Sequence, residues 1–172
     1  MSSDPGLGRF DTLERPDAES LLLSCLPVPR WVAEVADGRP YREWPALSAA
    51  ADAAAAVLDD GELAMALAAH PRIGERASGP GHRAELSARE QSGVDSGDPG
   101  VADALAAGNA AYEERFDRVF IVRAAGRDAS EVLAELERRL GNDDETERAE
   151  TVGQLREIAL LRLREAVSSW PR

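Results

Sequence analysis

The fold class is decided by the stretch Thr146–Val167, TERAETVGQLREIALLRLREAV, whose apolar side chains recur with the period of an α-helix. At about 100° per residue, one sector of this helix is formed by Val152, Leu155, Ile158, Ala159, Leu163 and Ala166. The pattern predicts a long amphipathic helix with this sector buried. Arg162 falls inside the sector, so we expect its guanidinium to point inward, whereas Arg164 lies on the opposite side.

The rest of the chain also favours helix over strand. Alanine is abundant, aromatic residues make up only 5% of the chain, and β-branched residues are sparse. Further helices are predicted at 19–26, 29–36, 46–58, 63–70, from 87 onward, from the turn at 96–100 to 116, and at 130–140, with one strand-like segment at 119–122. We therefore predict an all-α protein, a single-domain compact helical bundle of about seven to nine helices that spans residues 1–172 and has a loose start at 1–8.

Composition excludes several function classes. The 172 residues carry 20 basic and 32 acidic side chains, a net charge of −12, so neither nucleic acid nor a membrane is expected as a partner. All 20 basic residues are arginines. Without lysine the chain has no Schiff-base nucleophile, no anchor for pyridoxal phosphate and no Walker-type phosphate loop.

The cysteine count and the apolar runs predict the compartment. Cys25 is the single cysteine, so an internal disulfide is impossible, and with only two histidines a cysteine-rich zinc site is excluded. No apolar run approaches the roughly 18–20 residues of a membrane span. We expect a cytoplasmic protein without a bound metal.

His70 stands at the end of a predicted helix, directly before Pro71. A residue before proline is pushed out of the α region, and the helix dipole at a C-terminal end favours a protonated imidazole. Such a histidine can act as a general acid near neutral pH. An ordinary histidine that caps the last carbonyls explains the same pattern. The loop predicted after it, at 74–84, is long enough to close over a site.

Ser87, Glu90 and Gln91 are spaced so that a hydroxyl, a carboxylate and an amide share one helical face with Val94. The polar groups could therefore converge on a ligand. Ser87 and Glu90 also form a capping box, which alone accounts for both. For Arg162, the alternatives to ligand binding are an internal ion pair with one of the acids and extension of the guanidinium to a solvated edge.

Taken in order, four segments resemble the decarboxylases of 2-oxo-4-hydroxy-4-carboxy-5-ureidoimidazoline (OHCU), which act in urate breakdown. They are His70–Gly74, Ser87–Gly93, Asn109–Tyr112 with Arg115 and Phe116, and Arg162–Leu163. The similarity extends over nearly the whole chain. It departs from the family at 116–120, where Phe-Asp-Arg-Val-Phe stands in place of a run similar to Phe-Gly-Phe-Pro-Phe.

The resemblance implies an all-α, dimeric, cofactor-independent enzyme. It makes His70 the acid, Glu90 the carboxylate that contacts the substrate, and Arg162 the buried arginine. It also implies that the substrate-binding residues are Pro71, Ser87, Ala88, Arg89, Glu90, Gln91, Phe120, Ile121, Val122, Arg123 and Ala124, with backbone groups of 120–124 meeting the ring.

The chemistry implied by the resemblance fits a chain without lysine. The leaving carboxylate sits on a carbon next to a C=N bond, so the substrate itself accepts the electrons that CO₂ leaves behind. We expect Arg162 to bind the anion, Glu90 to accept from the substrate hydroxyl and His70 to deliver a proton to one face, giving (S)-allantoin.

Two other function classes remain open at this stage. An acidic, alanine-rich helical domain could serve as a non-enzymatic partner-binding module, which would tolerate His70→Ala. A helical hydrolase acting on a ureido or imidazoline substrate would release ammonia or urea instead of CO₂.

Overall fold

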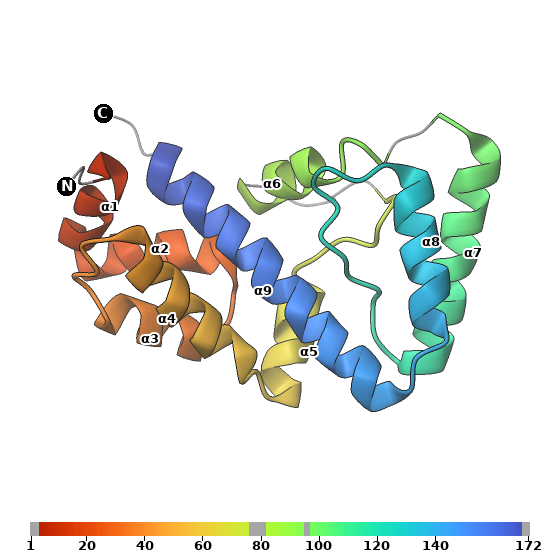
Figure 1. Cartoon of the computed structure of the whole chain (residues 1–172), viewed down its shortest axis with the longest axis horizontal. Coiled ribbons are helices and arrows are strands. Elements are labelled where there is room, and N and C mark those ends of the chain that lie inside the picture. Colours follow the sequence, from red (N-terminus) through yellow and green to blue (C-terminus); the bar gives the residue numbers. More distant parts are fainter. Residues whose placement is uncertain (1–3, 76–81, 95–96, 170–172) are drawn as a thin grey trace. The chain divides into compact units, whose positions relative to one another are not determined.

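The computed structural model describes residues 4–75, 82–94 and 97–169. Over these residues the chain forms nine α-helices and no strand, which confirms the predicted all-α class (Figure 1). Within the same ranges, no helix is both long enough and apolar enough to cross a membrane.

The helices form two compact units. The first unit contains residues up to 66 and from 155 onward, and the second contains residues 67–154. Two helices, α5 (Asp60–Ala68) and α9 (Asp144–Ser169), contribute residues to both. The single-domain organisation expected from the chain length stays a prediction.

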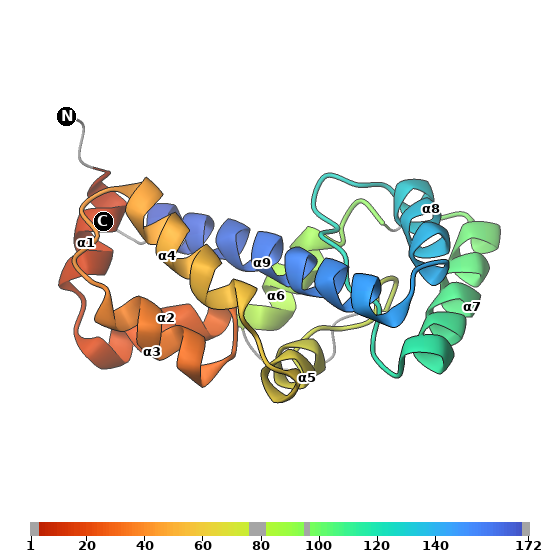
Figure 2. The ribbon, with the colours of Figure 1, turned by 60° about the horizontal axis from the view of Figure 1, so that its bottom comes forward.

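The first unit is a set of short helices packed against the second half of α9. Its members are α1 (Pro5–Thr12), α2 (Arg15–Cys25), α3 (Pro29–Asp37) and α4 (Trp44–Ala56). Each of these four helices has a proline in its first turn, where the missing N–H leaves no hydrogen bond unmade. Figure 2 shows α2 beside α3 and α3 beside α4.

Side chains fix the direction of α9 within this unit. Arg156 donates to both oxygens of Asp52 at 2.8 and 2.7 Å, and the Arg164 guanidinium lies 4.6 Å from the ring centre of Trp44. The residue numbers rise along α9 as they fall along α4, so the two helices are antiparallel. At the centre of the unit, fully buried Trp31 donates its indole N–H to the carbonyl of Ala51 at 2.8 Å.

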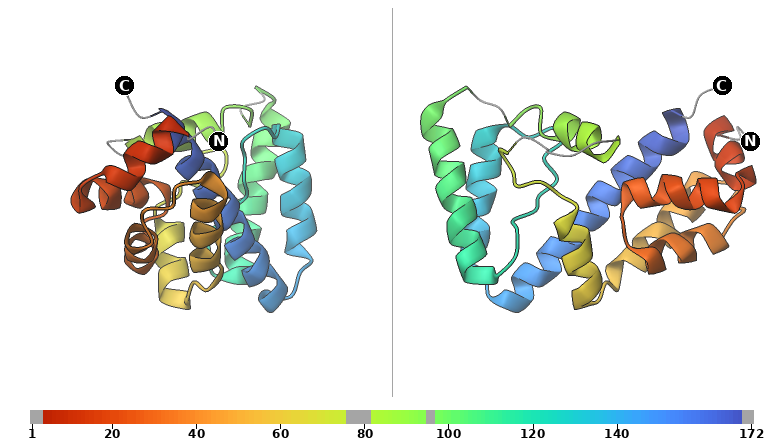
Figure 3. Two further views of the ribbon diagram at one scale, coloured as in Figure 1. Left: turned by 60° about the vertical axis from the view of Figure 1, so that its left-hand side comes forward. Right: turned by 180° about the vertical axis from the view of Figure 1, so that it is seen from behind.

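The second unit is formed by α6 (His82–Glu90), α7 (Pro99–Phe116), α8 (Ala129–Leu140) and the first half of α9. Helices α7 and α8 pack side by side and run in the same direction, so residues 117–128 must return along their length before α8 begins (Figures 1 and 3). The core between them includes Leu105, Tyr112, Phe116, Phe120, Val132 and Leu136.

Several predicted boundaries are wrong at helix starts. Helix α1 begins at Pro5, inside the stretch expected to be loose, because Asp4 caps it by accepting from the Gly6 N–H at 3.0 Å and Leu7 and Phe10 are buried. Helix α2 begins at Arg15 instead of 19 and α6 at His82 instead of 87. The extra turn of α6 contains Ala84 and Glu85, which are strong helix formers.

The strand-like segment 119–122 forms neither strand nor helix. Its apolar side chains Phe120, Ile121 and Val122 are buried, as a strand pattern requires, but no neighbouring strand lies in the described part of the chain. The pattern therefore predicted burial correctly and secondary structure wrongly.

Candidate active site

The turn that follows α5 carries the histidine singled out in the sequence. The His70 N–H donates to the carbonyl of Leu67 at 3.0 Å, which completes the end of the helix. His70 and Pro71 are both half-buried, and Ile73 is buried. Gly74 has a φ of +88°, a left-handed conformation that glycine adopts without steric cost. The glycine thus lets the chain turn away directly after Ile73.

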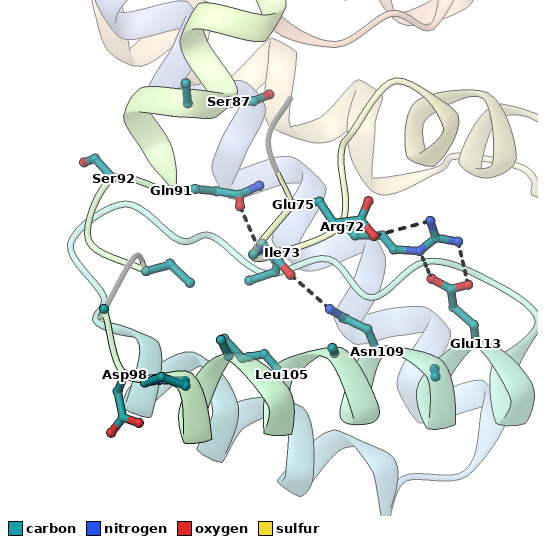
Figure 4. Close-up of a pocket in the computed structure, with 18 residues that line it drawn as sticks. Arg72, Ile73, Glu75, Ser87, Gln91, Ser92, Asp98, Leu105, Asn109 and Glu113 are labelled. Carbon is teal, nitrogen blue, oxygen red and sulfur yellow. Dashed lines mark hydrogen bonds and ion pairs between the residues drawn. The ribbon is translucent and has the colours of Figure 1, made fainter. Parts of the chain in front are cut away.

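Two amide side chains fix this turn to the neighbouring elements (Figure 4). The Nδ2 of Asn109, on α7, donates to the carbonyl of Ile73 at 3.0 Å. The N–H of Gly74 donates to Oε1 of Gln91, just beyond α6, at 3.1 Å. Three segments far apart in the sequence therefore meet at this turn. They are the same three segments of the second unit that carry the family resemblance.

An ion pair holds the outer side of the turn. Arg72 donates to both carboxylate oxygens of Glu113 on α7, with Nη2 2.9 Å from Oε2. This pairing, by its hydrogen bonds first and its charge second, lowers the pKa of Glu113 and raises that of Arg72. Glu75 adds a longer contact to Arg72 at 3.7 Å. Arg72 is therefore engaged by carboxylates on two sides.

A pocket of about 1070 Å³ opens between this turn, the end of α6 and the face of α7 that runs from Pro99 to Glu113. Its size suits a small ligand. The walls combine polar and apolar groups, among them Arg72, Ile73, Ser87, Gln91, Leu105, Asn109 and Glu113 (Figure 4). No cluster of three or more metal-ligating side chains exists among the described residues.

Asn109 is the least satisfied polar group of the wall. Its side chain is 6% exposed, and its Oδ1 is buried and accepts no hydrogen bond from any residue that the structure describes. An unmet buried carbonyl costs free energy, which offsets part of the gain from the hydrogen bond of Nδ2 to Ile73.

The predicted contacts divide between the pocket and its surroundings. Ser87, Ala88 and Gln91 line the pocket, and His70 and Pro71 directly precede the turn that lines it. Half-buried Glu90 is the last residue of α6; neither it nor exposed Arg89 lines the pocket. Because α6 begins at His82, Ser87 lies inside the helix and is 4% exposed, so its interpretation as a capping residue is wrong. Of the predicted 74–84 loop, residues 76–81 lie outside the described residues.

The 120–124 segment lies in the same unit but does not line this pocket. Its backbone is held by two side chains. The Ile121 carbonyl accepts from Arg139 at 2.6 Å, and the Arg123 N–H donates to Gln154 at 2.8 Å.

Arg162 is buried on α9 in the first unit, with 3% exposure, which confirms that it points inward. It lies near Cys25, where its positive charge lowers the thiol pKa slightly. Burial dominates and raises that pKa to about 12, so the thiol stays protonated and unreactive. The convergence of Arg162 with His70 and Glu90 stays a prediction.

Sequence reasoning did not single out Asn109 as a pocket residue or Arg139 as a buried one. Both could have been found by the periodicity that identified Arg162. Asn109 falls on the stripe of Leu105, Tyr112 and Phe116, and Arg139 falls on the stripe of Val132 and Leu136. The pairing of Arg72 with Glu113, 41 residues apart, leaves no such signal.

Comparison with known proteins gives one family and two similar folds. A sequence model of the family described as OHCU decarboxylase matches residues 11–164. A crystal structure of OHCU decarboxylase in the presence of (S)-allantoin is similar with a TM-score of 0.69 and 22% identity, covering 86% of this chain and 96% of that one. A crystal structure of (S)-allantoin synthase has a TM-score of 0.69 and 18% identity over 93% of this chain, but only 53% of that longer chain. At these identities the two structures show the fold. No curated protein matches significantly in sequence.

Proposed function

The chain belongs to the OHCU decarboxylase family, and we propose that it performs the family's reaction with His70, Glu90 and Arg162 as its catalytic residues. The reaction, a step of urate degradation, converts 2-oxo-4-hydroxy-4-carboxy-5-ureidoimidazoline to (S)-allantoin, so the enzyme is a carboxy-lyase.

The reaction balances without an external electron acceptor. The bond from C4 to the carboxylate breaks, CO₂ leaves, and the electron pair forms a C4=C5 double bond as the C5=N bond opens and its nitrogen takes a proton. The C4 hydroxyl then loses its proton to become the ring carbonyl, while C5 gains a proton on one face. Two protons are thus gained and one is lost, a net uptake of one. The protein's tasks are to bind an anion, accept the hydroxyl proton and deliver the proton to C5, while water supplies the proton on nitrogen.

Each proposed residue fits one of these tasks. Glu90 accepts the hydroxyl proton. Of the two half-buried groups, Glu90 at the end of α6 and His70 before the turn, the carboxylate is the stronger hydrogen-bond acceptor. His70 donates the proton to C5, as an imidazole can exchange protons near neutral pH. Arg162 binds the substrate anion by charge-assisted hydrogen bonds.

The charge of the pocket wall supports a role for an arginine outside it. Arg72 is the one cation among the described lining residues, and Glu113 and Glu75 already engage it. An anionic substrate therefore needs a counter-charge from elsewhere, since Glu75, Asp98 and Glu113 give the wall a negative excess. The family resemblance assigns this task to Arg162, whose guanidinium can make paired, charge-assisted hydrogen bonds.

The substrate-binding contacts are proposed on the same basis. Ser87, Ala88 and Gln91 line the pocket, and Gln91 also accepts from the turn that follows His70 and Pro71. Arg89 and the backbone groups of 120–124 do not line this pocket, and the family resemblance alone supports their contacts with the substrate ring. The observation that carries the proposal is the hydrogen-bonded meeting of the His70–Gly74 turn with Gln91 and Asn109 beside one pocket.

The test generates the short-lived substrate in place from urate, using urate oxidase and hydroxyisourate hydrolase, and follows allantoin by circular dichroism. The wild-type protein is expected to give one enantiomer rapidly, and His70→Ala to abolish this. His82→Ala, which changes the other histidine, is the matched control and should leave the rate unchanged. Slow, racemic product with the wild-type protein would reject the proposal in favour of a non-enzymatic helical module, and release of ammonia or urea would point to a hydrolase.

Arg162 is tested by replacing its planar fork with an ammonium. Arg162→Lys keeps the charge but loses paired hydrogen bonds, so we expect kcat/KM to fall by about tenfold or more. Arg164→Lys, on the exposed side of the same helix, is the control and should be silent. Near-normal turnover of Arg162→Lys would contradict the paired contact.

We also propose that the enzyme is a cytoplasmic homodimer that works without a cofactor. The resemblance to the family supports the dimer, and the single, buried cysteine suits a reducing compartment. Light scattering of the purified protein tests the dimer. Full activity after exhaustive dialysis against a chelator tests independence from metal, and lost activity restored by an added metal would contradict it.

A further inference from the structure

The segment 120–124 is buried but has no regular secondary structure. Phe120, Ile121, Val122 and Ala124 are each less than 5% exposed, yet no helix or strand ladder takes up their peptide groups. Buried peptide groups must be paired. The Ala124 carbonyl accepts from the Arg127 N–H at 3.0 Å, and side chains of other elements supply the partners of Ile121 and Arg123. The identity of those side chains decides how the segment is oriented.

Arg139 of α8 is the principal partner. Its guanidinium is completely buried, and Nη1 donates to the Ile121 carbonyl at 2.6 Å. The same group lies 4.8 Å from the ring centre of Phe120, and Nη2 donates to Thr151 at 3.2 Å. One guanidinium thus contacts the side chain of one residue of the segment and the backbone of the next.

A buried carboxylate fixes Arg139 in turn. Glu147, at the start of α9, is fully buried, and its Oε1 accepts from Nε of Arg139 at 2.9 Å and also from Nη2. The same oxygen accepts from the Tyr112 hydroxyl, and Oε2 accepts from Asn142 at 2.9 Å. Because Tyr112 and Asn142 hold Glu147, and Glu147 holds Arg139, the guanidinium cannot shift without breaking several hydrogen bonds at once.

Gln154 completes the anchoring two residues further along. Its Oε1 accepts from the N–H of Arg123 at 2.8 Å. In a trans peptide, the C=O of one residue and the N–H of the next point in opposite directions. The Val122 N–H therefore points away from Arg139, which holds the Ile121 carbonyl, and the Val122 C=O points away from Gln154, which holds the Arg123 N–H.

Stability alone does not explain a buried ion pair, because apolar residues of similar size usually serve as well. We propose that Arg139 is a positioning residue for the decarboxylation, which, with Glu147 and Gln154, orients the backbone of 120–124 so that the Val122 peptide groups face the substrate. This inference rests on the proposed function, which assigns substrate contacts to that backbone.

The test removes the anchor without leaving a buried charge. The double variant Arg139→Met/Glu147→Gln deletes the donor to Ile121 and keeps an oxygen for the Tyr112 hydroxyl. Arg138→Met, on the exposed neighbour that pairs with Glu135 and Glu150, is the matched control. The readouts are steady-state kinetics with substrate generated in place and amide hydrogen exchange of 120–124.

We expect the double variant to raise KM about tenfold with kcat changed by less than about twofold, since a misplaced binding group weakens ground state and transition state alike. Exchange of the 120–124 amides should accelerate, and Arg138→Met should change neither. Unchanged exchange, or faster exchange with an unchanged KM, would overturn the positioning role. An inactive wild-type protein would overturn the proposed function and this role together, while the exchange data would still report whether Arg139 anchors the segment.

A second pair of variants serves if the double variant does not fold. Gln154→Met removes the acceptor for Arg123 and should raise KM in the same way, whereas Gln154→Glu retains an oxygen and should restore it. Equal KM values for Gln154→Met, Gln154→Glu and the wild-type protein would overturn the proposal.

Discussion

The buried pair of Arg139 and Glu147 makes a quantitative prediction about stability. Both side chains have 0% exposure, so Arg139→Met leaves a carboxylate in the core without its cation and the Ile121 carbonyl without its donor. Breaking such a pair costs about 3–5 kcal/mol. For a chain of this length, the melting temperature should fall by about 6–20 °C.

The double variant Arg139→Met/Glu147→Gln should lose less than Arg139→Met alone, because neither charge then remains buried. The assay is urea unfolding followed by far-ultraviolet circular dichroism, which reports the loss of helix in both units. Exposed Arg138→Met is the control, with an expected loss of about 0.2–1 kcal/mol. The coupling would be refuted if the double variant lost as much free energy of unfolding as Arg139→Met and Glu147→Gln lose together. A loss below about 1 kcal/mol in Arg139→Met alone would refute it as well.

Two further predictions concern the turn beside the pocket. Asn109→Leu should change the free energy of unfolding by less than about 1 kcal/mol, because the lost hydrogen bond to Ile73 is offset by removal of a buried carbonyl that has no donor among the described residues. The same variant should lower kcat/KM about tenfold. Urea unfolding and steady-state kinetics measure the two effects, and unchanged activity would contradict the role of the turn. Glu113→Gln should reduce the free energy of unfolding at neutral pH but not in acid. Arg72 lowers the folded-state pKa of Glu113 below 4.5, so the ion pair stabilises the protein above pH 4.5 and this contribution disappears as the pH falls through the folded pKa. A stability difference between variant and wild type that persists in strong acid would contradict the pairing.

The sequence predicted the fold class well because helical periodicity is a local property. The apolar stripe of 146–167 and the buried position of Arg162 both follow from spacing of about 3.6 residues. Helix starts were less predictable because each depends on a few residues: Asp4 caps α1 through the N–H of Gly6, and the helix formers Ala84 and Glu85 extend α6 ahead of Ser87. The 119–122 stretch shows the limit clearly, because an apolar run predicts burial but cannot say whether another strand will pair with it.

The site was predictable only through ordered motifs. Ser87 and Gln91 line one pocket, and spacing alone had already placed them on one face. The hydrogen bonds that hold the site together join residues far apart in the sequence. The Gly74 N–H donates to Gln91, 17 residues away, and Arg72 donates to Glu113, 41 residues away. Contacts at such separations depend on how helices pack, which no local pattern encodes.

The sequence has arginine and no lysine, and the ion pairs of the structure depend on the shape of the guanidinium group. Among the described residues, five ion pairs use two guanidinium nitrogens on two carboxylate oxygens. They join Arg30 to Glu62, Arg72 to Glu113, Arg156 to Asp52, and Arg138 to both Glu135 and Glu150. An ammonium cannot form such paired contacts, and it is more strongly hydrated and so costlier to bury. Arg139 extends the argument, since its fork bonds a carboxylate, a hydroxyl and a backbone carbonyl in different directions. Arg139→Lys would keep the charge beside Glu147, but an ammonium on a flexible stem could not also hold the Ile121 carbonyl in the same place. The core of the second unit therefore depends on the shape of arginine as much as on its charge.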